Sequence, residues 1–311
     1  MSDVARPRFG QGRTAARILG KVIAVAVYLG SRVPSSVAHG LAWVGGHVEW
    51  AARRGKRNVL AVNLGHAVGK APGDRAVRRL VRREFVNEAH RSADLLWALG
   101  KPQEFLATLD VVGLEHVHEA AARRRGVVLV GVHVGGWELA TTVPAALIPV
   151  PTTALVADDW LAWAIEDMRA RVGLRVVFRT DPVAKIGALL RRGEALVVIG
   201  DDASGTEPRM HTVRFLDADA ELPSGAVTLA RLYEAAIVGF HVLPLGHRRW
   251  RLVFEEPIVP DRRAEDEKLL QQLADSWTTL LSEVPEHWAA SFPIRWLPVQ
   301  PNGDSESSAI S

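Results

Sequence analysis

The 311-residue chain contains no cysteine, which excludes disulfide bonds and metal sites built on thiolates. Its N-terminal apolar run, residues 18–29, is only about a dozen residues long and is interrupted by Lys21, so it is too short to span a bilayer. No small-residue cleavage site follows that run, and we therefore do not interpret it as a signal peptide. The chain also lacks internal repeats and the G-x-S-x-G elbow of serine hydrolases.

The charge balance leaves several kinds of partner open. The formal net charge is +3, the calculated pI is about 9.5, and arginine strongly outnumbers lysine. Clustered arginines suit an anionic membrane surface, a phosphorylated substrate or a nucleic acid. The sequence has neither the zinc-ligand spacing nor the stacking-aromatic pattern of a nucleic-acid module. We therefore expect no nucleic-acid partner.

The length and the hydrophobic content of 48% are sufficient for a large packed core. Residues 1–17 are polar and basic and are predicted to be flexible, and residues 300–311 are polar and predicted to be disordered. Residues 18–299 between them are predicted to form one domain.

The segment GVVLVGVHVGGWELA, residues 126–140, is the centre of the predicted fold. Its β-branched run over residues 127–132 is typical of a strand buried on both faces. His133 follows at the carboxyl end of that strand, where ligand sites gather in open α/β sheets. Gly135 and Gly136 then allow a sharp turn into a helix.

His133 and Glu138 are five residues apart, which would place them on different faces of a continuous helix. They can meet if His133 lies in the turn and Glu138 lies in the first turn of the following helix. A histidine held by a carboxylate is a general base with a fixed tautomer. The alternative is a buried histidine bonded to a carbonyl, with Glu138 solvated at a helix N-terminus.

The remainder of the chain repeats the order helix, glycine, apolar strand and polar end. This order predicts an α/β fold, a single domain with a mixed central β-sheet flanked by helices. A long helix is expected over residues 72–99, and an amphipathic one is carried by Leu269, Leu273, Trp277, Leu280 and Val284. The other expected strands cover residues 152–157, 174–178, 194–199, 236–245 and 250–256, and the other expected helices cover 115–124, 160–172, 182–192 and 225–234.

Polar residues at two other strand ends should share a rim with His133. Arg179 could hold a substrate phosphate, or it could pair with Asp181 or Asp201. Asp201 and Asp202 could position a base or bind a metal, but no further ligand lies close in sequence. We therefore expect no metal site.

The two N-terminal apolar stretches, residues 18–29 and 37–48, are expected to be short helices that contact a membrane surface. Trp43 and Trp50 lie in or beside the second stretch, and a basic cluster, Arg53, Arg54, Lys56 and Arg57, follows it. Apolar helices with tryptophans and adjoining basic residues are typical of monotopic membrane contact. The alternative is a helical hairpin packed on the domain with its arginines solvated.

Residues 203–224 are polar and punctuated by glycine and proline, which predicts a long functional loop. The loop carries three acidic residues near its end, Asp217, Asp219 and Glu221. The helix predicted after it points its N-terminus at this loop and could bind an anion.

Gly113-Leu-Glu115, the strand GVVLVGVHVGGWEL and the closing Pro285-Glu286-His287-Trp288 resemble the bacterial lipid A biosynthesis (lauroyl/myristoyl) acyltransferase family. The resemblance covers roughly residues 22–296 and includes the actinobacterial branch of phosphatidylinositol mannoside acyltransferases. The mark of the family is a histidine, four residues, and then an acidic residue, here His133-Val-Gly-Gly-Trp-Glu138. The resemblance implies an Asp-rich turn at Asp201 and Asp202 that shapes the pocket, and N-terminal helices at the cytoplasmic face of the cell membrane. It also implies a pocket carboxylate in the loop over residues 203–224, and it leaves open whether this is Asp217, Asp219 or Glu221.

The resemblance implies transfer of a fatty acyl chain from acyl-CoA or an acyl carrier protein to a hydroxyl of a membrane glycolipid or lysophospholipid. His133 would be the base and Glu138 its orienter, Gly135 and Gly136 would offer oxyanion-hole amides, and no resident cofactor is expected. The expected partners are therefore an anionic membrane surface, a lipid acceptor and an acyl thioester donor. Two rival hypotheses are metal-assisted hydrolysis by His133, Asp201 and Asp202, and a non-catalytic membrane-binding protein with this fold.

Overall fold

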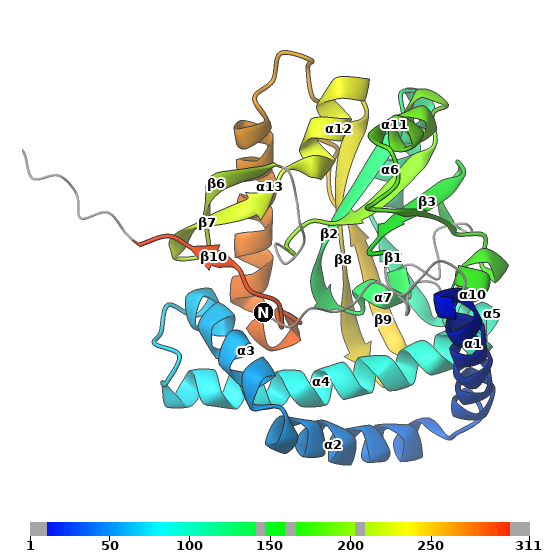
Figure 1. The fold of residues 1–311 in the computed structure, drawn as a ribbon, viewed down its shortest axis with the longest axis vertical. Coiled ribbons are helices and arrows are strands. Elements are labelled where there is room, and N and C mark those ends of the chain that lie inside the picture. The colour runs from blue at the N-terminus through cyan, green and yellow to red at the C-terminus, as the bar shows by residue number, and fades with distance from the viewer. Residues whose placement is uncertain (1–10, 141–146, 159–165, 203–208, 299–311) are drawn as a thin grey trace, which may run out of the picture.

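The computed structural model describes residues 11–140, 147–158, 166–202 and 209–298 (Figure 1). A seven-stranded sheet forms the centre, in the order β1-β9-β8-β2-β5-β3-β4. All its neighbouring strands run parallel except β8 and β9, which form an antiparallel pair. The predicted mixed α/β sheet is therefore confirmed. Its strands are β1 (Leu109–Val112), β2 (Val127–Gly135), β3 (Thr152–Val156), β4 (Arg175–Phe178), β5 (Ala195–Ile199), β8 (Ala236–Gly246) and β9 (Arg249–Phe254).

The central strand β2 is buried along its length except at His133, which is half-buried. Val128, Val130, Val132 and Val134 belong to one apolar core, whereas Val127 and Leu129 belong to a second. Successive side chains of a strand point to opposite faces, so a continuous apolar run is required where helices cover both. The continuous valine run therefore explains why this strand can lie inside the sheet.

Helices follow the strands as the sequence pattern predicted. The described helices after β1 are α6 (Leu114–Ala122), α7 (Trp137–Ala140), α10 (Glu166–Arg171), α11 (Val183–Arg191), α12 (Gly225–Tyr233), α13 (Asp266–Glu283) and the 3₁₀ turn η1 (Pro285–His287). The expected start of the helix over residues 160–172, and the end of the helix after Glu138, lie outside the described residues.

Within the described residues 11–108, five helices precede β1, namely α1 (Gln11–Gly30), α2 (Ser35–Ala52), α3 (Arg54–Ala67), α4 (Arg75–Gly100) and α5 (Pro102–Thr108). The first of them begins within the segment that was expected to be flexible. Figure 1 shows α4 crossing below one end of the sheet, with α2 outside it and α1 at its side. Among the described residues, no helix combines the length and apolarity needed to cross a bilayer.

Helix α2 is fixed to α4 by a buried carboxylate. Asp94 of α4 is 1% exposed, and its Oδ1 lies 2.8 Å from Nε2 of His39 on α2. Its Oδ2 accepts hydrogen bonds from the indole of Trp250 at 3.0 Å and from the backbone N–H of Arg248 at 3.3 Å. Because a buried charge needs such partners, Asp94 joins α2, α4 and the β8–β9 hairpin at one point.

The prediction of a long loop over residues 203–224 is wrong for its second half. A hairpin of β6 (Met210–Phe215) and β7 (Ala218–Pro223) occupies it and pairs with β10 (Arg295–Trp296) in a small antiparallel sheet. The physical reason is that buried apolar residues alternate with polar ones along both strands, although the composition of the segment as a whole is polar. Its inward positions, Val213, Phe215, Ala218, Ala220 and Leu222, are all buried.

Asn63 of α3 binds the C-terminal segment, residues 288–296, to the domain by hydrogen bonds. Its side-chain amide donates to the carbonyls of Ala290 and Phe292, both at 2.9 Å. Its Oδ1 accepts a hydrogen bond from the indole of Trp296, also at 2.9 Å. Asn63 is 1% exposed, so its own side chain is shielded from water in all three bonds.

Asn63→Ala should lower the free energy of unfolding by about 3 kcal/mol, since it leaves two carbonyls and an indole N–H without their partner. Urea denaturation measures the change, and Asn58→Ala, an exposed position on the same helix, is the matched control. Hydrogen exchange should accelerate over residues 290–296 in the Asn63 variant alone. Equal stability of the two variants would contradict this account of the C-terminal segment.

Candidate active site

The pairing of two neighbouring strands brings His133 beside Asp201. Strands β2 and β5 run parallel, with Gly131 opposite Ile199. His133 and Asp201 each lie two residues beyond that pair, so they are level at the carboxyl edge of the sheet. The strand continues to Gly135, and His133 therefore lies in β2 and not in the turn that we expected.

Asp201 accepts hydrogen bonds from three N–H groups. Its Oδ1 lies 2.7 Å from Nδ1 of the His133 ring, and the backbone N–H of His133 donates to both carboxylate oxygens at 3.1 and 3.2 Å. The indole of Trp288 donates to Oδ2 at 2.9 Å. Asp201 is fully buried, so these donors replace the hydration of its charge.

The C-terminal segment completes this arrangement. The backbone N–H of Ala289 donates to the carbonyl of His133 at 2.7 Å, and Val134 forms an isolated bridge with Trp288. The segment thereby extends the hydrogen bonding of β2 and delivers the Trp288 indole to Asp201.

Two aromatic rings limit the movement of the imidazole. The ring of Trp137 meets that of His133 edge-on with centroids 4.7 Å apart, and the ring of Phe292 lies 4.9 Å away. The His133 side chain is still 16% exposed. Because Nδ1 faces Asp201, Nε2 is the ring nitrogen available for proton transfer with a bound molecule.

Glu138 lies in α7, close to a second set of charges. Burial raises the pKa of its carboxyl, against the smaller lowering effects of Arg91 and His133. Arg91 itself is buried in α4, where it forms a two-bond ion pair with the buried Glu84, the shorter bond being 2.7 Å. Glu138 is therefore a carboxylate kept in a poorly solvated position near the imidazole.

The two glycines after His133 serve the packing of the strand. Gly135 has φ of +53°, and a Cβ there would lie 1.8 Å from the carbonyl oxygen of Val242. The N–H of Gly136 donates to that same carbonyl at 2.8 Å. The Gly136 amide is thus engaged with Val242, and it would have to leave that bond to serve the oxyanion hole that we predicted near these glycines.

Arg179 lies on the predicted rim, but it approaches Asp202 and not the two aspartates that we considered as partners, Asp181 and Asp201. It follows β4, and its guanidinium lies 3.8 Å from a carboxylate oxygen of Asp202, which follows β5. Asp181 instead accepts hydrogen bonds from the backbone of Phe178 and from Lys185, and these two bonds lower the pKa of its carboxyl.

The three candidate carboxylates of the former loop have partners on or beside the small sheet. Asp217 lies 2.5 Å from Nδ1 of His66, Asp219 lies 3.6 Å from Arg214, and Glu221 accepts a hydrogen bond from Arg295 at 2.9 Å. Glu221 also lies within the ladder opposite Thr212. The structure therefore gives Glu221 a pairing role in this sheet.

A metal site does not fit the residues at the rim. Asp201 uses its oxygens for three N–H donors, and a guanidinium approaches Asp202. In the part of the chain that the structure describes, no group of three or more histidine and acidic side chains is arranged to hold a metal.

This geometry can be compared with known proteins. A sequence model of the bacterial lipid A biosynthesis acyltransferase family matches residues 12–296. The chain belongs to this family. It is also similar to the lipid A biosynthesis lauroyltransferase of Escherichia coli (strain K12), with 26% identity over 136 residues. That similarity covers 42% of this chain and 43% of the relative.

Membership of the family confirms the family resemblance that we stated on the His133-x₄-Glu138 motif and the closing Pro-Glu-His-Trp segment. The sequence reading missed the hydrogen bond from the ring to Asp201 and the indole of Trp288 behind it. A signal was present, because both strands follow an Arg-Arg-Gly sequence that ends at Gly126 and at Gly193. If the strands are taken as parallel neighbours, His133 and Asp201 lie at almost matching positions.

The raised pKa of Glu138 predicts a pH-dependent stability difference between the wild type and Glu138→Gln. The fold favours the protonated carboxyl, so the wild type should lose stability as pH rises from the ordinary value of 4.5 up to the raised folded pKa. Neutral glutamine has no such loss. The free energy of unfolding of Glu138→Gln should therefore rise relative to the wild type across that window and level off above it.

Urea denaturation over a pH series measures this difference, and Glu115→Gln, at an exposed position in the first turn of α6, is the control expected to stay flat. Other titrating groups, including the buried Glu84, are present in both proteins, so their contributions cancel in the difference between the two free energies of unfolding. A wild type that gains stability relative to Glu138→Gln with rising pH would show that the carboxylate is favourably paired.

Proposed function

We propose that this protein transfers a fatty acyl chain from a thioester donor to a hydroxyl group of a membrane lipid, with His133 as general base. The observation that carries the proposal is the hydrogen-bonded series from the His133 ring to Asp201 and Trp288 at the edge of the sheet. Membership of an acyltransferase family supports the reaction class. The donor is acyl-CoA or an acyl carrier protein.

The reaction follows from the position of the imidazole. Asp201 accepts a hydrogen bond from Nδ1–H, so Nε2 carries the lone pair and takes the proton of the acceptor hydroxyl. The oxygen attacks the thioester carbonyl carbon and forms a tetrahedral intermediate. When the intermediate collapses, the C–S bond breaks and the leaving thiolate takes the proton from Nε2, which restores the neutral ring.

Two carboxylates, those of Asp201 and Glu138, would stabilise the imidazolium that forms when His133 takes up the proton. Asp201 orients the ring through its direct bond and stabilises the positive charge that forms on it. Glu138, which we first expected to orient the ring, lies in the helix that follows β2, and in its ionised form its negative charge would add to the stabilisation of the imidazolium.

Arg179 and Asp202 would form the substrate-binding part of the rim. They face each other across the carboxyl ends of β4 and β5, at 3.8 Å. Guanidinium groups bind phosphate oxygens by paired hydrogen bonds, so Arg179 would hold a phosphate of the donor or acceptor at this rim. Among acceptors, phosphatidylinositol mannosides are the first to assay, because the sequence resembles the branch that acylates them.

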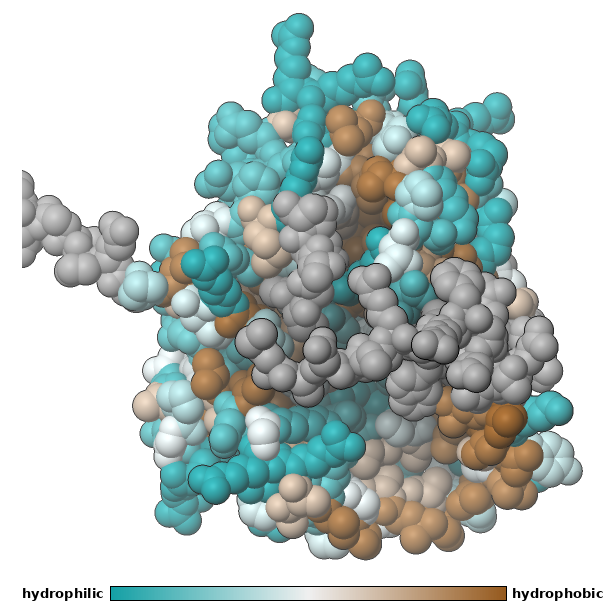
Figure 2. All heavy atoms as spheres, viewed as in Figure 1, coloured by the Kyte–Doolittle hydropathy of each residue, from teal (hydrophilic) through white to brown (hydrophobic). Residues whose placement is uncertain are grey.

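The N-terminal helices would hold the protein on the cytoplasmic face of the cell membrane as a peripheral protein. Figure 2 shows hydrophobic side chains along the lower edge of the view, where α1 and α2 lie. The large apolar side chains exposed there are Ile18, Val22, Val25, Tyr28, Leu29, Val37, Leu41, Trp43, Val44 and Val48. A contiguous patch of this kind is costly in water and is typical of an interaction surface.

Acyl transfer by the purified protein tests the proposal. Labelled acyl-CoA and acyl carrier protein are offered with vesicles that contain phosphatidylinositol mannosides or lysophospholipids, and the acylated product is identified by mass spectrometry. His133→Ala should lower the initial rate by about 10²–10⁴-fold, because that is the usual contribution of a general base.

Two further variants separate chemistry from folding. His133→Asn keeps a side-chain N–H near the position of Nδ1 for Asp201 but has no counterpart of Nε2, so it should fold like the wild type and lack activity. His118→Ala, at an exposed position on α6, should retain the wild-type rate. A folded His133→Asn protein that transfers acyl chains at the wild-type rate would refute His133 as the base.

A further inference from the structure

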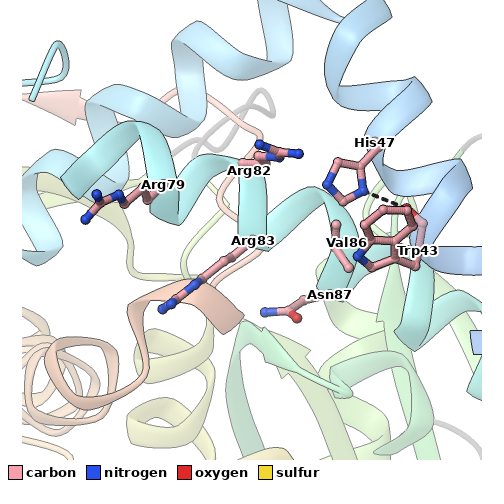
Figure 3. A pocket seen from close by; sticks show the side chains of 7 residues that line it. All are labelled: Trp43, His47, Arg79, Arg82, Arg83, Val86 and Asn87. Atoms are coloured by element: carbon pink, nitrogen blue, oxygen red, sulfur yellow. Dashed lines mark hydrogen bonds between the residues drawn. The ribbon is translucent and has the colours of Figure 1, made fainter. Parts of the chain in front are cut away.

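One face of α4 presents three arginines to the outside of the molecule. Arg79, Arg82 and Arg83 recur with Val86 and Asn87 at helical spacing, so they lie on one side of the helix. Together with Trp43 and His47 of α2 they line a groove between the two helices, shown in Figure 3. We call this the arginine groove.

A close helix crossing forms the groove. A Cβ at Gly46 of α2 would lie 2.7 Å from the carbonyl oxygen of Phe85 and 2.8 Å from the Cα of Val86. Glycine therefore lets the two backbones touch at this point. The neighbouring side chains of α2, Trp43 and His47, then lie over α4 beside its arginines, as Figure 3 shows.

The charge in the arginine groove is largely uncompensated. Neither Arg79 nor Arg82 forms an ion pair with another residue that the structure describes, although Arg82 lies over the ring of Trp50. Arg83 approaches the carboxylate of Glu286 only to 3.9 Å. The nearby carboxylates of α2 and α4, Glu49 and Glu88, both accept hydrogen bonds from Lys56.

A stripe of apolar side chains borders the groove. Val37, Leu41, Val44 and Val48 are spaced at three and four residues on α2, and each is at least half exposed. Trp43 lies between this stripe and the arginines and is 54% exposed. An indole is well suited to a boundary between hydrocarbon and polar headgroups.

We propose that the arginine groove binds the phosphate of an anionic phospholipid headgroup while the α2 stripe enters the outer part of the bilayer. Guanidinium groups bind phosphate oxygens by paired hydrogen bonds, and the stripe accounts for the apolar surface beside them. A free phosphate ion would leave that apolar surface uncovered. The proposal rests on the membrane contact in the proposed function and not on acyl transfer.

The groove is also joined to the candidate active site. The side chain of Asn87 donates to the carbonyl of Glu286 at 2.7 Å, in the turn that leads to Trp288 and thus to Asp201. A headgroup held in the groove would therefore orient this edge of the protein towards the membrane that carries the acceptor.

Vesicle binding by the full-length protein tests the proposal. The probes are vesicles of phosphatidylcholine alone and of phosphatidylcholine mixed with phosphatidylglycerol, at one fixed ionic strength. The test variant is Arg79→Gln/Arg82→Gln. The control is Arg123→Gln/Arg263→Gln, which removes the same charge beyond α6 and before α13, at the opposite end of the view in Figure 1.

The wild type should bind the anionic vesicles more tightly than the neutral ones. The test variant should lose affinity for anionic vesicles by about fivefold for each arginine, with binding to neutral vesicles unchanged. The control should stay close to the wild type on both. Replacing chloride by inorganic phosphate at the same ionic strength should displace little protein, because the apolar stripe keeps its contact.

Three results would overturn the proposal. Equal losses of affinity in the test and control variants would mean that only the net charge of the protein matters. If the wild type bound both kinds of vesicle equally, or bound neither, an anionic headgroup could not be the ligand of the groove. Displacement by inorganic phosphate would identify a free-anion site. Acyl transfer is measured separately with detergent-dispersed acceptor, so the groove and the proposed reaction can fail independently.

Discussion

The fully buried carboxylate of Asp201 is the group on which the candidate site depends. Moving an ionised carboxylate out of water costs several kcal/mol unless other groups replace its hydration. Three N–H groups do so here, from the backbone and ring of His133 and from the indole of Trp288. Each such bond to a charged acceptor contributes about 1.5–3 kcal/mol, so all three are required together.

This requirement explains why distant parts of the chain meet at one point. The register of β2 on β5 sets His133 level with Asp201, and the C-terminal segment must return to the end of β2 to deliver Trp288. Asn63 holds the same segment from the other side. The same bonds also fix which nitrogen of the imidazole faces away from Asp201. They therefore satisfy both the buried charge and the orientation of the ring that the proposed catalysis requires.

The sequence predicted those features that depend on a local pattern. The valine run of β2, the strand ends at Arg179 and Asp202 and the amphipathic face of α13 all follow from periodicity, and the structure contains them. The His133-x₄-Glu138 spacing identified the family. The β6–β7 hairpin was missed because the buried positions of β7 include two short alanines and alternate with half-buried acidic residues, so its composition is that of a polar loop.

The partnership of His133 with Asp201 could not be read from spacing, because it depends on which strands are neighbours and in what register. The same is true of the arginine groove, which exists only because Gly46 lets two helices touch. Pairing across 68 residues, as for His133 and Asp201, is a property of the folded sheet. Local sequence can name the candidates at strand ends, but the topology decides which of them meet.

The central claim is that His133 and Asp201 act as one catalytic unit, and a double-mutant cycle of initial acyl-transfer rates tests it most directly. Asparagine at position 201 can still accept one N–H, but its amide group would favour the wrong tautomer of the ring, so Asp201→Asn alone should lower the rate by up to about 10⁴-fold. In the His133→Ala background the same change should have almost no further effect, because residues that act as a unit are non-additive. Rate losses that multiply in the double variant, or an Asp201→Asn protein that melts lower yet retains the wild-type rate, would contradict the account.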